Sequence, residues 1–218
     1  MKKFIIGGGV LLVITIIVVI IVVIAGGSSY NHLVSLSQET DKQWAQVQNV
    51  YQRRADLVPN LVATVSGAAN FEKSTLTEIA DARASVGKVT VNTSSAPTDP
   101  AQLAAFDKAQ GQLGTALSRL LVVSENYPQL RATDSFRDLQ AQLEGTENRI
   151  SVERERFNQV VQSYNTAVKS FPTVFFAGMM GFQPKPYFAA APDAQSAPKV
   201  NFDFNHNSPG GATAPAQP

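Results

Sequence analysis

The stretch FIIGGGVLLVITIIVVIIVVIA, from Phe4 to Ala25, decides how this chain of 218 residues is organised. It contains no charged side chain. At about 1.5 Å per residue, a helix of this length spans about 33 Å, enough to cross a hydrocarbon core of about 30 Å. Within hydrocarbon, a single segment satisfies its backbone groups only as a helix. We therefore expect one transmembrane helix over Phe4 to Ala25, in contact with membrane lipid.

The residues that flank this helix indicate whether it is cleaved and how it is oriented in the membrane. Ala25 and Gly27 are small enough to precede a cleavage site, so a secretory signal peptide is the alternative. The apolar core of a signal peptide is usually about 7–15 residues long, and the longer run here favours an uncleaved anchor. Lys2 and Lys3 lie in the short N-terminal flank of residues 1–3, and the next basic residue is Lys42. The positive-inside rule then predicts a cytoplasmic N-terminus and an exported remainder.

The chain that follows is expected to be helical. Gly26 to Ser29 read as a flexible exit, and residues 30–182 carry apolar side chains three and four positions apart, which is the helical pattern. The first stripe runs from Tyr30 to Val86, with a kink or restart expected at Pro59. Two further stripes run from Phe106 to Val123 and from Phe136 to Val168.

Helices with apolar stripes and short connections bury one another as a bundle. We find no alternating run that indicates a strand. The expected fold is therefore all-α: an antiparallel up-and-down bundle of three to four long helices, preceded by a single transmembrane helix.

Two C-terminal segments differ from the rest. Val174 to Phe182 is apolar but too short to span a bilayer, so it either covers the end of the bundle or contacts a membrane surface or a partner. Residues 183–218 are rich in Pro, Ala, Gln, Gly and Asn, which predicts a disordered tail. Tyr187 and Phe188 are its last expected docking point.

Composition excludes several classes of function. The chain has 18 basic and 17 acidic residues, two of the basic ones before the anchor, so the bundle lacks the basic footprint of a nucleic-acid-binding protein. There is no cysteine, and the histidines are His32 and His206 alone. Thiolate ligands are thus excluded and a histidine metal site has few ligands. No nucleophile with an adjacent base and no glycine-rich phosphate loop is present, so we expect no catalytic residue, metal or cofactor.

The clearest candidate residues for a structural or partner contact are Arg53, Arg54 and Asp56. Adjacent arginines on a helix point about 100° apart, so they do not share one partner face. We expect one of them to form an ion pair with Asp56, Glu125 or Glu147. The alternative is a ligand or partner site.

The other candidates lie in two polar runs: Glu125, Asn126 and Tyr127, and Glu147, Asn148 and Arg149. The first run ends a helix before Pro128, with Tyr127 packed on the bundle end. In the second, Asn148 lowers helix propensity, so an interhelical hydrogen bond is expected to offset it. Residues 153–156 are expected on a solvated face. Trp44, the single tryptophan, is expected in the core.

Several short motifs occur in order along the bundle: YNHLV at 30–34, RRADLVPNLV at 53–62, SENYP at 124–128, TENRI at 146–150, FP at 171–172 and GF at 181–182. This arrangement resembles the LemA family over roughly Tyr30 to Phe188. The resemblance implies a bacterial protein of the inner membrane with a mostly four-helix antiparallel bundle, and it implies no catalytic residues or cofactor. Some members are described with the bundle in the cytoplasm, whereas Lys2 and Lys3 favour export here.

Three functions remain open at this point. A non-enzymatic scaffold or adaptor for protein partners at the bacterial membrane is favoured by the helical pattern, the free tail and the missing chemistry. The alternative is a homo-oligomeric, envelope-organising structural protein, and an enzyme with a carboxylate site between helices is the least favoured. The sequence names no partner, although the family context points to membrane quality-control proteins such as membrane peptidases.

Overall fold

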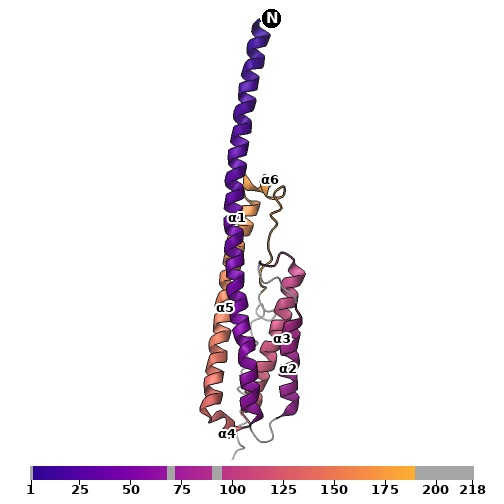
Figure 1. Ribbon diagram of the computed structural model, residues 1–218, viewed down its shortest axis with the longest axis vertical. Helices are drawn as coiled ribbons and strands as arrows, with labels where there is room; N and C mark the ends of the chain where they lie inside the picture. Colours follow the sequence, from indigo (N-terminus) through magenta and orange to yellow (C-terminus); the bar gives the residue numbers. More distant parts are fainter. Residues whose placement is uncertain (1, 68–71, 90–94, 190–218) are drawn as a thin grey trace, which may run out of the picture. The chain divides into compact units, whose positions relative to one another are not determined.

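The computed structural model describes residues 2–67, 72–89 and 95–189, with side chains from residue 11 onward. This described part is helical and contains no strand, which confirms the all-α prediction. Its helices, drawn in Figure 1, are α1 (Lys2–Ser66), α2 (Lys73–Lys88), α3 (Pro100–Ser124), α4 (Pro128–Arg131), α5 (Asp134–Lys169) and α6 (Thr173–Ala177).

Helix α1 runs for 65 residues from the apolar segment into the bundle without a break. The large apolar side chains from Leu11 to Ile24 are 49–69% exposed, whereas Gly26 and Ser29 are buried. The expected flexible exit at residues 26–29 is therefore wrong. Glycines weaken an isolated helix, but here this turn is held by packing against α6. The bundle thus begins where the apolar run ends.

Of the kink or restart expected at Pro59, the restart does not occur, because Pro59 lies within α1. Proline has no N–H, so the carbonyl of Ala55, four residues earlier, loses its helical partner. The Nε of Arg83, on α2, donates to this carbonyl at 3.3 Å. The first helical segment instead ends at Ser66, and α2 begins at Lys73.

The helices pack in an antiparallel, up-and-down order. Helix α1 lies along α5, and α2 lies along α3 (Figure 1). Asp99 caps α3 by accepting a hydrogen bond from the N–H of Ala101 at 2.8 Å, and Thr133 caps α5. Helix α4 lies in the connection at the end of the bundle away from the apolar run, and α5 returns toward that run.

Three apolar clusters fill the bundle along its length. The far cluster, around Leu61, Leu113 and Phe136, joins α1, α2, α3 and α5. The middle cluster is aromatic: Trp44 is fully buried and its ring lies 5.2 Å from that of Phe106 and 5.6 Å from that of Phe157, as expected for a core tryptophan. The proximal cluster consists of Leu33, Tyr164, Val168 and Ala177 and ties α6 to α1 and α5. Full burial of each large apolar side chain contributes about 1.5–3 kcal/mol.

The chain after Phe182 is ordered further than composition predicted. Phe188 is 5% exposed and its ring lies 5.5 Å from that of Phe157, so residues 183–188 belong to the bundle. We call these residues the strap. The remainder of the expected disordered tail, 190–218, lies outside the described residues.

Candidate functional site

Arg54 forms a polar layer that crosses three helices. It is 3% exposed, and its Nη1 donates to Glu147 Oε1 on α5 at 2.9 Å. Its Nη2 donates to the main-chain oxygen of Gln110 on α3 at 2.8 Å and to the side-chain Oε1 of Gln110 at 2.6 Å. The guanidinium also lies over the ring of Tyr51, 5.1 Å from its centre. One arginine therefore ties α1, α3 and α5 together.

Gly114 lies where the guanidinium meets α3. A β-carbon at this position would lie 3.4 Å from Arg54 Nη1, in van der Waals contact with the guanidinium. The layer is nevertheless incompletely bonded, because Arg54 Nε finds no hydrogen-bond partner among the described residues. The side chain of Glu147 is 47% exposed, so water reaches one side of the ion pair.

The remaining sequence-predicted residues do not converge on this layer. Arg53 is exposed, and Asp56 is exposed and accepts a hydrogen bond from Gln52 Nε2 at 2.7 Å. Glu125 and Asn126 are exposed just after α3 ends, whereas Tyr127 is half-buried against the far cluster.

In the second run, Asn148 and Arg149 are both exposed. The interhelical hydrogen bond expected for Asn148 is therefore wrong. The face of α5 that meets its neighbours carries Thr146 and Ile150, and Asn148 lies between them on the solvent side.

Arg154 was expected on a solvated face but lies at an interface. Its Nη1 pairs with Asp107 Oδ1 on α3 at 2.9 Å, and the guanidinium lies 4.5 Å from the ring centre of Phe188. It also reaches the hydroxyl of Tyr51 at 3.5 Å. Burial raises the pKa of the Tyr51 hydroxyl above its ordinary 10.0, and the positive charges of Arg154 and Arg54 partly oppose that rise.

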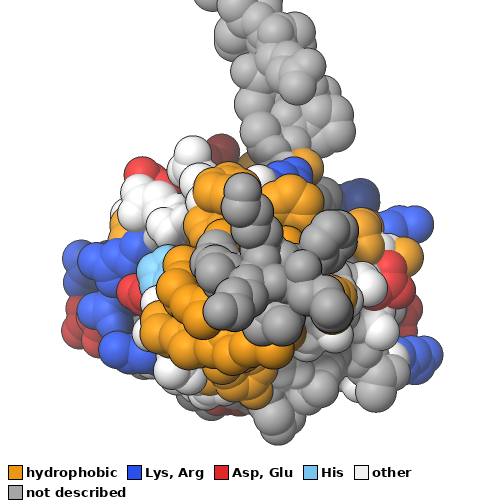
Figure 2. All heavy atoms as spheres, turned by 90° about the horizontal axis from the view of Figure 1, so that it is seen from above, with side chains coloured by type: hydrophobic (Ala, Val, Ile, Leu, Met, Phe, Trp, Pro, Cys, Tyr) orange, Lys and Arg blue, Asp and Glu red, His pale blue; other side chains and the backbone are white. Residues whose placement is uncertain are grey.

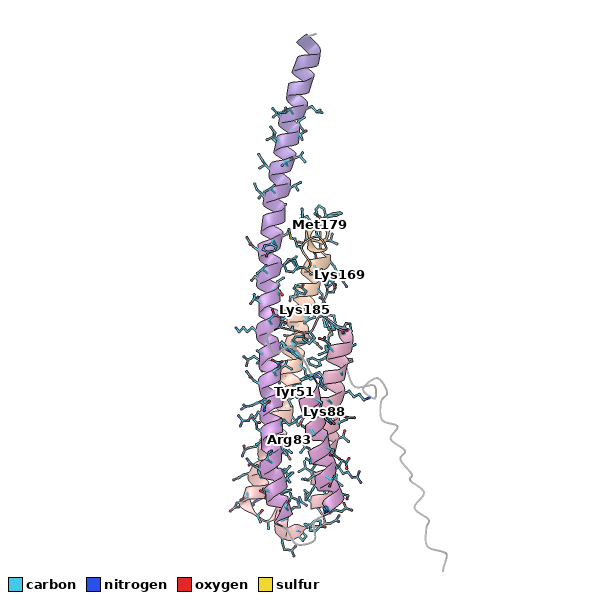
Figure 3. All side chains as sticks on the ribbon, turned by 45° about the vertical axis from the view of Figure 1, so that its right-hand side comes forward. Tyr51, Arg83, Lys88, Lys169, Met179 and Lys185 are labelled. Atoms are coloured by element: carbon cyan, nitrogen blue, oxygen red, sulfur yellow. The ribbon has the colours of Figure 1, made fainter. Side chains whose placement is uncertain are left out.

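Lys185, in the strap, forms a second polar layer that the sequence did not indicate. It is 6% exposed, and its Nζ donates to Thr40 Oγ1 at 2.7 Å, Asp41 Oδ1 at 3.1 Å and Ser37 Oγ at 3.2 Å, all on α1 (Figure 3). The ammonium lies 5.2 Å from the ring centre of Tyr164. A buried lysine is tolerated only with such partners, so the strap is bonded to α1 at a defined point.

Two asparagines on α5 hold the backbone of the strap. Asn165 accepts from the N–H of Lys185 and donates to its carbonyl, both at 2.8 Å. Asn158 makes the same pair of bonds with Phe188, at 2.9 and 3.0 Å. Seven helical residues rise about 10.5 Å, and three extended residues span about 10 Å. The spacing of the asparagines therefore matches that of the strap residues.

A sequence model of the LemA family matches residues 43–202, most of the chain. The chain belongs to the LemA family. The magnetosome proteins MamQ 2 and MamQ 1 of Paramagnetospirillum magneticum are each 27% identical to it, and MamQ of Magnetospirillum gryphiswaldense is 26% identical. Each match covers 75% of this chain and 65% of the relative, so the chain spans less than two thirds of their length.

A groove lies beside Lys185. The groove has a volume of about 630 Å³ and lies between the N-terminal end of α3, the start of the strap and α1. Its one carboxylate is Asp41, which already accepts from Lys185 and, at 2.8 Å, from the N–H of Ala96. An enzyme with a carboxylate site between helices would need acids that converge on such a groove. In the described part of the chain, Glu147 instead faces Arg54, and no cluster of three or more His, Asp or Glu residues is placed to hold a metal.

Proposed function

We propose that this LemA-family protein is a non-enzymatic scaffold or adaptor that holds a helical bundle at a bacterial membrane and presents it to protein partners. One observation carries the proposal: α1 continues without a break from the apolar segment to the far end of the bundle. A flexible tether would let the bundle tumble. A continuous helix instead fixes its direction, and the part of α1 after Ala25 extends about 60 Å at 1.5 Å per residue.

The polar residues of the interior support a mechanical role. Arg54, Arg154 and Lys185 each bond side chains or carbonyls of neighbouring elements, which stiffens the bundle against shear. The MamQ relatives are named as magnetosome proteins, but since this chain spans 65% of their length we carry over no magnetosome role. Lys2 and Lys3 support a cytoplasmic N-terminus and an exported bundle.

A position-specific crosslinking experiment tests the scaffold. A photoreactive amino acid is placed, one site at a time, at Arg53, Asn148 or Arg149 in the full chain in native membranes, since these sites are exposed on the bundle. We expect the same heterologous protein to be captured at a subset of sites. The buried Leu113 position is the control and should capture nothing. Capture of a second copy alone would contradict the proposal and favour a homo-oligomeric structural protein.

The orientation has a separate test. A reporter enzyme that is active only outside the cytoplasm, fused after Pro218, should be active. If only a reporter that works in the cytoplasm is active, the proposed orientation is wrong. The scaffold proposal does not depend on this result and is tested by the crosslinking experiment.

A further inference from the structure

The largest group of exposed apolar side chains outside the apolar run of α1 lies at and around α6. Among the described residues, Phe171 is 81% exposed, Phe175 67%, Val174 46% and Met179 88%. The rings of Phe171 and Phe175 contact each other edge to face, with centres 6.0 Å apart. Other exposed large apolar residues of the described bundle, such as Val122 and Val152, are scattered. A contiguous exposed apolar surface marks an interaction site.

This surface lies at the level where the apolar run of α1 ends. The ring of Phe176 covers Gly26, since a β-carbon at Gly26 would be 3.5 Å from it. The ring of Phe182 lies 5.8 Å from that of Tyr30, one turn further along α1. Thr173 and Ala177 are buried against the bundle. The position of α6 is therefore fixed on its inner side, and its outer side is left free.

The level of Gly26 corresponds to the interfacial layer of a bilayer. The headgroup regions extend the hydrocarbon core of about 30 Å to a total of about 40–45 Å, so each layer is about 5–8 Å thick. If Phe4 to Ala25 fill the hydrocarbon, Gly26 is the first residue in that layer. Figure 3 shows Met179 near the top of α5 and beside α1.

The charge distribution allows the membrane to approach this surface. No Asp, Glu, Lys or Arg occurs from residue 4 to 38 on α1 or from residue 170 to 184 around α6. Insertion here therefore removes no full charge from water. Lys169 is exposed at the edge of this uncharged region, where an ammonium can reach lipid phosphates. In Figure 2, which looks onto this end, hydrophobic side chains, including those of the apolar run of α1, gather around the centre and charged ones toward the rim.

We infer that Phe171, Phe175 and Met179 insert into the interfacial layer of the leaflet from which α1 emerges, so that α6 is a second membrane contact. The inference rests on the proposed membrane anchor. The surface around α6 continues the apolar surface of α1, so the bilayer that surrounds the one is expected to contact the other. Apolar side chains that insert at a membrane interface reach about 5–10 Å into the boundary between headgroups and acyl chains. Two contacts, α1 and α6, then fix the rotation of the bundle about α1.

The absence of cysteine provides a direct test, because each introduced cysteine is a unique labelling site. The full chain carrying Phe175→Cys is labelled with a nitroxide and reconstituted in vesicles of phosphatidylcholine and phosphatidylglycerol. Collisions with oxygen, which concentrates in lipid, are compared with those of a water-soluble nickel complex. We expect oxygen to dominate at residue 175. Val122→Cys, 64% exposed at the far end of the bundle, is the matched control at which the nickel complex should dominate.

Ile17→Cys, in the apolar run, distinguishes failure of this inference from failure of the proposed membrane anchor. If residue 17 contacts lipid and residue 175 resembles residue 122, the inference is overturned and the anchor stands. If residue 17 itself contacts the nickel complex, the anchor and the inference fail together. Met179→Cys is a second site for the same comparison, and Trp44 emission verifies that each labelled chain has folded.

Discussion

Replacing Arg54 with alanine should destabilise the bundle strongly, whereas replacing its neighbour Arg53 should not. Arg54 is 3% exposed and holds Glu147 and two acceptors of Gln110, whereas Arg53 is exposed. The pair is chemically matched and adjacent in sequence. The difference between the two variants therefore measures the packing environment rather than the residue type.

The magnitude follows from the partners that would be left behind. Gln110 is 4% exposed, and an unsatisfied buried acceptor costs about 1–3 kcal/mol. Breaking a fully buried ion pair costs about 3–5 kcal/mol, but Glu147 is 47% exposed, so water compensates much of that loss. Because Arg54 Nε has no hydrogen-bond partner among the described residues, the native polar layer contributes less to the free energy of unfolding than a fully bonded layer would. We expect Arg54→Ala to lower the free energy of unfolding by about 3 kcal/mol, and Arg53→Ala by no more than about 0.5 kcal/mol.

Urea unfolding of the full chain in mild detergent measures this difference. Emission from Trp44, the single tryptophan and fully buried, reports the unfolding of the bundle rather than of the apolar run. Glu147→Gln, alone and combined with Arg54→Ala, gives the coupling energy of the ion pair. Equal, near-neutral effects of the two arginine variants would refute the reasoning and return the arginines to the candidates for partner binding.

Three further outcomes are expected. Deleting residues 190–218 should leave the unfolding midpoint unchanged, whereas deleting residues 183–218 should cost about 3 kcal/mol or more because it removes Phe188 from the aromatic core. Asn165→Ala should increase hydrogen exchange at the amide of Lys185, while Asn165→Asp, which keeps an acceptor oxygen, should protect it better than alanine does. Because burial raises the pKa of Tyr51, its contribution to stability is complete below about pH 10 and is lost as the pH rises through the folded pKa. Tyr51→Phe should therefore reduce the fall in urea midpoint above about pH 10.

The long helices and the core tryptophan were predictable because their signals are local and periodic. The choice between the two arginines was not local. Arg54 lies between Tyr51 and Val58, and Arg53 lies between Val50 and Leu57, with the same spacing of three and four positions, so both could continue an apolar stripe. The partner, Glu147, was one of three candidates on three different parts of the chain, and the selection among them depends on how the helices pack against one another.

Other features depended on tertiary contacts that no local pattern encodes. Gly26 to Ser29 have low helix propensity, but the Phe176 ring and the bundle cover this turn and keep it helical. Pro59 lies within α1, and Arg83, from another helix, bonds the carbonyl that proline frees. The strap resembles disordered chain in composition and is ordered by side chains 20 or more residues away.

The prolines of the strap help to explain why it binds in one register. Asn165 and Asn158 on α5 each accept a hydrogen bond from a backbone N–H of the strap. The sequence of the strap is QPKPYF, from residue 183 to 188. Moving the strap by one residue in either direction would bring Pro184 or Pro186 to Asn165, and proline has no N–H to donate. Lys185, between the two prolines, is thus the residue that satisfies Asn165 while its ammonium meets Thr40 and Asp41. The prolines, which in composition resemble those of a disordered tail, therefore exclude the two neighbouring registers. They also favour an extended backbone, which the spacing of Asn158 and Asn165 requires.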